Sequence, residues 1–130
     1  MADIDYSKFK LLIVDDVPLN VLLVSKILSR FPMKIIPSYS GQQALEIISR
    51  ERPDVIVLDL MMPIMDGFEV LDKIRNNPET SDIKVVILSA LNSNDDIVRG
   101  FKAGANDFVT KPIIMERLIN AINKQLEELS

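Results

Sequence analysis

Short runs of apolar residues, each ended by a polar residue, recur along the chain. Four of them have the length and β-branched content of strands buried on both faces, as in a parallel sheet. These strands are expected at residues 10–14, 55–58, 84–88 and 107–110, with a shorter one at 34–37. Pro37 removes a hydrogen-bond donor from that shorter strand, which therefore belongs at an edge of the sheet.

Segments with apolar residues at helical spacing alternate with these strands. They predict helices at about 18–30, 41–50, 68–75, 94–103 and 113–129. The apolar positions in the first helix are Leu19, Leu22, Leu23, Ile27 and Leu28. In the last helix a continuous stripe is formed by Ile114, Leu118, Ile122 and Leu126.

The alternation of strands and helices predicts the α/β class and a doubly wound (βα)5 architecture. Right-handed crossovers would place helices on both faces of a five-stranded parallel sheet. No linker or low-complexity segment interrupts the pattern, so we expect residues 1–130 to form one domain with its core at about 9–128.

Composition narrows the range of functions. The chain has 48% hydrophobic and 26% charged residues, which is typical of a soluble globular protein, and its net charge of −4 argues against a nucleic-acid partner. It carries no secretory signal and no apolar run near the ~20 residues of a membrane span, so a cytoplasmic location without membrane contact is expected. Because the chain has no Cys and no His, its chemistry must come from carboxylates, hydroxyls, lysines or backbone groups.

Polar side chains stand where the predicted strands end. Asp15 and Asp16 follow the first strand, Asp59 the third, Ser89 the fourth and Lys111 the fifth. Ligands bind beyond the carboxyl ends of the strands in an open parallel sheet, so these groups are expected to converge at one edge. Three carboxylates, a hydroxyl and a lysine suit a divalent cation together with a phosphoryl group.

Each of these residues also has a simpler interpretation. Asp15 or Asp16 could cap the first helix instead of binding a cation. Asp59 is placed to attack phosphorus as a nucleophile, or it could be a plain ligand or cap. Ser89 could hold a phosphoryl oxygen or merely form a turn, and Lys111 could pair with a carboxylate or phosphoryl group or lie in solvent.

Four motifs in the chain, LLIVDD, VIVLDLMMPIMDGFEVL, VVILSA and GANDFVTKP, resemble those of two-component response-regulator receiver domains, the CheY-like family. The resemblance covers nearly the whole chain and implies a flavodoxin-like sheet of order 2-1-3-4-5. It implies that Asp59 is the phosphoacceptor in an acidic pocket with Asp15 and Asp16. The backbone carbonyl of Met61 would be a further ligand of Mg²⁺, for which Mn²⁺ could substitute. Ser89 and Phe108 would be the switch residues, and the bond between Lys111 and Pro112 would be cis.

The resemblance also implies a mechanism and partners. A histidine kinase or histidine phosphotransfer protein would donate a phosphoryl group to Asp59, and Ser89 and Lys111 would then close on its oxygens. The face made by the fourth helix, the fifth strand and the last helix would then change its affinity for a downstream protein, an output domain or a second copy of the chain. Kinase specificity is expected on the exposed side of the first helix, around Asn20, Val24 and Ile27. Such a protein assists its own phosphorylation and slow dephosphorylation but turns over no external substrate.

Several positions depart from the commonest family pattern. Ser89 stands where Thr is more frequent and keeps the hydroxyl, whereas Phe108 replaces a Tyr and can act only through ring packing, as a switch or as an ordinary core residue. Ile113 stands where many members have Phe. Met61 and Leu91 would flank the phosphoryl group, and neither can activate a water molecule, so slow self-dephosphorylation is expected.

Three other functions compete with the receiver interpretation. A metal-dependent phosphohydrolase would need a cap or long loops to form a substrate pocket, for which this chain has no residues left. A flavodoxin-like electron carrier would need a phosphate-binding loop where Asp15 and Asp16 stand. A pseudo-receiver that serves only for docking would be expected to have lost part of the pocket, and every member is present.

Overall fold

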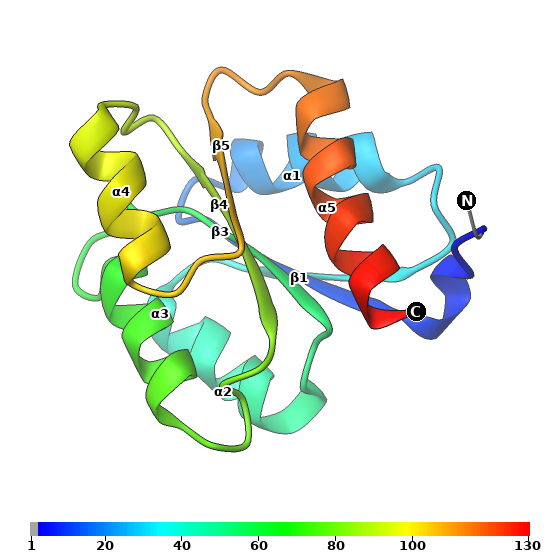
Figure 1. The fold of residues 1–130 in the computed structure, drawn as a ribbon, viewed down its shortest axis with the longest axis horizontal. Helices are drawn as coiled ribbons and strands as arrows, with labels where there is room; N and C mark the ends of the chain where they lie inside the picture. The colour runs from blue at the N-terminus through cyan, green and yellow to red at the C-terminus, as the bar shows by residue number, and fades with distance from the viewer. Residues whose placement is uncertain (1–2) are drawn as a thin grey trace.

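A five-stranded parallel sheet forms the centre of the computed structural model, which describes residues 3–130 (Figure 1). The strand order is β2-β1-β3-β4-β5, which confirms the predicted flavodoxin-like topology. Pro37 of β2 pairs with Ile13 of β1, and β2 lies at the sheet edge, as expected from the missing backbone N–H of Pro37. The strands are β1 (Lys10–Val14), β2 (Lys34–Ser38), β3 (Val55–Leu58), β4 (Lys84–Ser89) and β5 (Asp107–Thr110).

Helices cover both faces of this sheet (Figure 1). They are α1 (Pro18–Leu28), α2 (Gly41–Glu51), α3 (Gly67–Asn76), α4 (Asn94–Lys102) and α5 (Met115–Leu129), and a short 3-10 helix, η1 (Tyr6–Lys8), precedes β1. None of the helices within residues 3–130 is both long and apolar enough to span a bilayer.

Two separate apolar cores lie on the two faces of the sheet. Successive residues of a strand point to opposite faces, so Leu11 and Ile13 of β1 join the core under α1 and α5. Leu12 and Val14 join the other core, under α2 and α3. A strand that serves both cores must be apolar at every position, which is why the strands read as uninterrupted apolar runs.

The exposed face of α1 is not the one that the sequence indicated. Val21, Val24 and Leu28 are buried, whereas Leu19, Leu22 and Leu23 are 70%, 51% and 46% exposed. The expectation that Val24 contributes to an exposed specificity surface is therefore wrong. Apolar residues occur on both sides of this helix, so their spacing alone did not reveal which side faces the sheet.

The start of α5 also differs from the prediction. The helix begins at Met115, and Ile114 has an extended backbone (φ −102°, ψ 113°) and a side chain that is 49% exposed. The buried stripe therefore begins one turn later and consists of Leu118, Ile122 and Leu126.

Candidate functional site

The carboxyl ends of β1 and β3 bring three carboxylates together. One oxygen each of Asp15, Asp16 and Asp59 lies within 4.8 Å of the others. Asp15 and Asp59 are only 4% and 6% exposed, and Asp16 is partly exposed. Buried carboxylates in contact repel one another, so this arrangement favours a bound cation. Carboxylate oxygens are the ligands that hard divalent cations prefer, so the cluster is suited to holding a divalent metal.

Backbone hydrogen bonds between neighbouring strands hold the two buried carboxylates in place. The N–H of Asp59 donates to the carbonyl of Val14 over 2.9 Å, and the N–H of Asp15 donates to the carbonyl of Ser38 over 3.2 Å. These bonds continue the parallel ladders by one residue beyond the strands. The acidic side chains are thus fixed to a rigid sheet although they lie at the start of loops.

Gly67 determines how closely the start of α3 approaches the backbone of Asp59. Its N–H donates to the carbonyl of Leu60 over 3.0 Å. A Cβ atom at Gly67 would lie 2.3 Å from the carbonyl oxygen of Asp59 and 2.7 Å from Cα of Leu60. The loop between β3 and α3 can fold back on Asp59 only because no side chain stands there.

Lys111 reaches the acidic cluster from the end of β5. Its Nζ is 3.1 Å from Oδ2 of Asp15 and 3.7 Å from Oδ2 of Asp59, and its side chain is 18% exposed. Its N–H donates to the carbonyl of Ser89 over 2.8 Å, and the bond between Lys111 and Pro112 is cis. Lys111 therefore pairs with the carboxylates and is not a solvated surface lysine.

The surroundings of Asp59 make its carboxyl group harder to ionise than that of an ordinary aspartate. Burial raises the pKa of the Asp59 carboxyl, and the neighbouring Asp15 carboxylate raises it further. The ammonium of Lys111 and the N–H groups of Met61 and Leu60 oppose this shift without cancelling it. An added positive charge at the cluster would thus stabilise the ionised, nucleophilic form of Asp59.

Asp15 and Ser89 also take part in turns, although no side chain within residues 3–130 caps α1, whose N-cap residue is Val17. Oδ1 of Asp15 accepts a hydrogen bond from the N–H of Val17 over 2.9 Å, so Asp15 shapes the turn before α1 as well as facing the cluster. The buried hydroxyl oxygen of Ser89 accepts from the N–H of Leu91 over 3.2 Å, a turn interaction. Ser89 thus stands at the same sheet edge, with its hydroxyl engaged in the loop that leads to α4.

Phe108 links β5 to the middle of α4. Its ring is partly buried, and a Cβ atom at Gly100 would lie 2.9 Å from ring atom Cδ2 and 3.0 Å from Cδ1 of Ile87. The ring therefore fills space that a side chain at position 100 would occupy. This contact, which the sequence did not reveal, places Phe108 between the end of β4 and helix α4.

A groove opens beside the acidic cluster. It measures about 500 Å³, and its walls include Met61, Phe68, Leu91 and Arg99. The Arg99 guanidinium lies 3.8 Å from the centroid of the Phe68 ring, a cation–π contact between α4 and the start of α3. The N–H of Met61 donates to Oδ1 of Asp59 over 3.4 Å, and the Met61 side chain is 57% exposed. No sequence motif signalled the pairing of Arg99 with Phe68.

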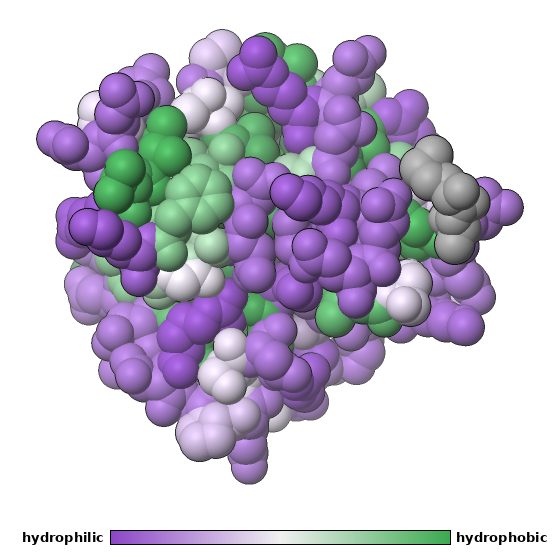
Figure 2. Space-filling view, in the orientation of Figure 1, coloured by the Kyte–Doolittle hydropathy of each residue, from purple (hydrophilic) through white to green (hydrophobic). Residues whose placement is uncertain are grey.

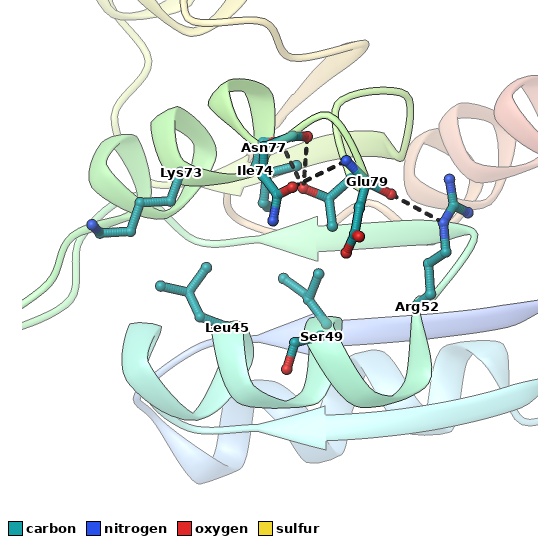
Figure 3. Close-up of a pocket in the computed structure, with 9 residues that line it drawn as sticks. Leu45, Ser49, Arg52, Lys73, Ile74, Asn77 and Glu79 are labelled. Carbon is teal, nitrogen blue, oxygen red and sulfur yellow. Dashed lines mark hydrogen bonds between the residues drawn. The ribbon is translucent and has the colours of Figure 1, made fainter.

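A second depression, between α2 and α3, differs from this site in its chemistry. It measures about 200 Å³, and Leu45 and Ile74 contribute apolar walls (Figure 3). Arg52 bridges its rim, with Nε donating to the carbonyl of Glu79 over 3.2 Å. Because Arg52 and Glu79 precede β3 and β4, the depression lies toward the amino ends of the strands, away from the carboxylate cluster.

Exposed apolar side chains gather over α4. Figure 2 shows them at the left of the view, whereas the visible surface of α5 is mainly hydrophilic. Val98 and Phe101 of α4 are 50% and 45% exposed. This apolar surface adjoins Gly100, against which Phe108 packs.

Comparisons with known proteins agree with this geometry. The model of the response regulator receiver domain matches residues 11–123. The response regulator PleD of Caulobacter vibrioides is 41% identical over 104 residues, which cover 80% of this chain but 23% of PleD. Protein PilH of Pseudomonas aeruginosa is 32% identical over a region that covers 90% of this chain and 97% of PilH. This chain spans about a quarter of the length of the first curated relatives that it matches.

Solved structures lead to the same family. The signal receiver domain of a LuxO repressor protein from Vibrio parahaemolyticus superposes with a TM-score of 0.86 at 32% identity, covering 92% of this chain and 91% of that domain. The chemotaxis protein CheY4 of Vibrio cholerae superposes with a TM-score of 0.83 at 28% identity, covering 89% of this chain and 97% of CheY4. Receiver domains are phosphoacceptor modules of two-component signalling, not turnover enzymes, and they pair with histidine kinases and with output partners. With its acidic pocket of Asp15, Asp16 and Asp59, this chain belongs to the response regulator receiver domain family.

Proposed function

We propose that Asp59 is the phosphoacceptor and that it takes its phosphoryl group from a phosphohistidine on a kinase or phosphotransfer protein. The observation that carries this proposal is the position of Asp59: a buried carboxylate at the end of β3, within reach of Asp15, Asp16 and Lys111. Leu60 and Met61, which directly follow Asp59, line the open groove beside it.

In the proposed step an oxygen of Asp59 attacks phosphorus, the P–O bond forms, and the bond between phosphorus and the histidine nitrogen breaks. The imidazole leaves and is protonated. Lys111, already 3.7 Å from Asp59, offers an ammonium to the phosphoryl oxygens. Asp15, Asp16, Asp59 and the Met61 carbonyl would hold Mg²⁺, which supplies positive charge to the carboxylates and the transferred group. Mn²⁺, which accepts the same oxygen ligands, could replace it.

The proposed switch passes from Ser89 to the face formed by α4, β5 and α5. Ser89 would release its bond to the N–H of Leu91 and turn its hydroxyl toward the phosphoryl oxygens. The Phe108 ring, which packs against Gly100 near Ile87, would turn inward behind the moving Ser89. The apolar surface of α4 would then change, and with it the affinity for a downstream protein, an output domain or a second copy of the chain. Phosphorylation shifts such an equilibrium only by its differential affinity for the two states.

We further propose that the partner docks on α1. Leu19, Leu22 and Leu23 form a contiguous apolar strip on a helix that begins three residues beyond Asp15. A strip of this kind fits the apolar seam of a helical bundle, whose phosphohistidine would then face the acidic cluster. The fitting location for this encounter is the cytoplasm, and the chain would act there as one receiver module, alone or within a longer protein.

The test is intact-protein mass after incubation with acetyl phosphate, with and without Mg²⁺. We expect one phosphoryl adduct on the wild-type protein that requires Mg²⁺. Asp59→Asn should abolish it, whereas Asp72→Asn, on the exposed side of α3, should retain it. Mg²⁺ binding without any adduct would instead favour a docking module that works without phosphorylation.

The docking proposal has a separate test with a phosphotransfer protein as donor. Leu22→Ser should slow transfer from that protein and leave phosphorylation by acetyl phosphate unchanged. Leu129→Ser, at an exposed apolar residue near the chain's end, is the matched control. Equal slowing with both donors would contradict a docking role for α1.

A further inference from the structure

Three of the chain's six methionines lie in the loop that follows Asp59, and their surroundings differ. The Met61 side chain is 57% exposed, whereas Met62 is 8% exposed. Met65 is partly buried and packs so closely on Gly41 that a Cβ atom there would lie 2.9 Å from its Cγ. A water-soluble oxidant that reaches this loop therefore meets the sulfur of Met61 first.

Met61 also stands beside the reacting carboxylate. Its N–H donates to Oδ1 of Asp59, and its side chain lines the same groove as Leu91. A thioether is a weak hydrogen-bond acceptor and Leu91 is none, so neither side chain can hold a water molecule for attack on phosphorus. The apolar character of this pair is what the proposed long lifetime of the phosphoryl group depends on.

We propose that Met61 is an oxidation site, and that its sulfoxide shortens the lifetime of the phosphoryl group on Asp59. The inference rests on the proposed function of Asp59. Hydrogen peroxide is the oxidant: the sulfur lone pair attacks one peroxide oxygen, the O–O bond breaks, an S–O bond forms, and the other oxygen leaves as water with the two protons. The sulfur loses two electrons and the peroxide gains them. The product is polar and is reversible by sulfoxide reduction.

The sulfoxide oxygen changes what the groove can do. It is a strong acceptor that can orient a water molecule toward phosphorus. Attack by this water breaks the P–O bond to Asp59, releases inorganic phosphate and regenerates the carboxylate. One hydrogen bond to the attacking water in the transition state corresponds to a rate increase of about fivefold.

Met115 provides an internal comparison. It is 48% exposed and will also oxidise, but its sulfur accepts a hydrogen bond from Arg30 of the α1–β2 connection, over 3.7 Å. Its oxidation should leave hydrolysis at Asp59 unaffected. Met61 and Met115, the exposed methionines among residues 3–130, therefore separate an effect of position from a general effect of peroxide.

The experiment treats the full chain with dilute hydrogen peroxide, maps each sulfoxide by peptide mass and then measures the half-life of the phosphoryl adduct. We expect oxidation at Met61 before Met62, and a half-life about fivefold shorter. In Met61→Leu, peroxide should not change the half-life, whereas in Met115→Leu it should shorten it as in the wild type. Met61→Gln, whose amide resembles the sulfoxide, should show the short half-life without peroxide.

Two results would overturn the inference: an unchanged half-life in protein with mapped oxidation at Met61, or the same shortening by peroxide in Met61→Leu. Neither would affect the proposed role of Asp59, because the adduct would still form. Failure of untreated protein to accept any phosphoryl group would overturn both proposals, and the two kinds of failure are thus distinguishable.

Discussion

Lys111 is closer to Asp15 than to Asp59: its Nζ lies 3.1 Å from Oδ2 of Asp15 and 3.7 Å from Oδ2 of Asp59. The ammonium thus neutralises part of the charge that a metal ion would otherwise neutralise, and it is already within reach of a group bound to Asp59. We therefore expect Lys111 and a divalent cation to compete for the same carboxylates before phosphorylation, and to act together in the proposed phosphoryl transfer.

Replacing Lys111 by Met should destabilise the fold and strengthen metal binding. The buried carboxylates lose a partner, which costs about 1–3 kcal/mol in the free energy of unfolding without metal. The same loss removes a competing cation, so the dissociation constant for Mg²⁺ should fall. Urea denaturation and a Mg²⁺ titration measure the two effects, and weaker Mg²⁺ binding would contradict the proposed competition.

Asp59→Asn should raise the free energy of unfolding near neutral pH in the absence of metal. Burial raises the pKa of Asp59 in the folded state above the ordinary value of 3.8, so ionised Asp59 opposes folding. A carboxyl whose pKa is higher in the folded than in the unfolded state stabilises the fold fully at pH values below its unfolded-state pKa. This stabilisation is lost as the pH rises through the folded-state pKa. The gain from Asn should therefore disappear below about pH 4. Thermal unfolding across pH measures it; a neutral-pH loss of stability would contradict this account.

Adding Mg²⁺ should reverse the order of stability of the wild type and Asp59→Asn. A cation that binds the folded state stabilises it more the more tightly it binds, and Asp59→Asn would remove one of its proposed ligands. Wild-type unfolding temperature should then rise more with Mg²⁺ than that of the variant. Equal rises would mean that Asp59 does not hold the metal.

The sequence was sufficient for most of the fold and for the members of the site, but not for their contacts. Strands buried on both faces must be apolar throughout, so β1 and β3 and the acids that follow them could be recognised. The exposed side of α1 could not be recognised from the sequence, because both sides of this helix carry apolar residues. Nor could the pairing of Arg99 with Phe68, which depends on how α4 is placed relative to α3. The apolar spacing of α5 likewise did not reveal the extended backbone of Ile114.

Polar side chains at positions 61 and 91 should shorten the life of the phosphoryl group. Met61→Asn with Leu91→Glu gives the groove hydrogen-bonding groups that can orient water, and hydrolysis should accelerate by about tenfold or more. Loss of the adduct over time, followed by mass, measures the rate. An unchanged half-life in the double variant would show that these two residues do not control hydrolysis.

Gly67→Ala should destabilise the protein and displace the loop that carries Met61. The added Cβ atom would lie 2.3 Å from the carbonyl oxygen of Asp59, which is backbone and cannot move aside cheaply. We expect a loss of about 1–3 kcal/mol, typical of overpacking, together with slower phosphorylation. The matched control is Ser49→Ala on the exposed side of α2, which should change neither the free energy of unfolding nor the rate of phosphorylation. Wild-type stability in Gly67→Ala would contradict the close approach.

In the proposed function the phosphoryl group is bonded to Asp59 and not to Asp15 or Asp16. The most direct measurement is borohydride reduction of the phosphorylated protein, which converts an aspartyl phosphate to homoserine, followed by peptide sequencing by mass. We expect homoserine at position 59 alone, and only in protein incubated with the phosphodonor and Mg²⁺. Homoserine at position 15 or 16, or in none of the three positions despite a stable adduct, would contradict it.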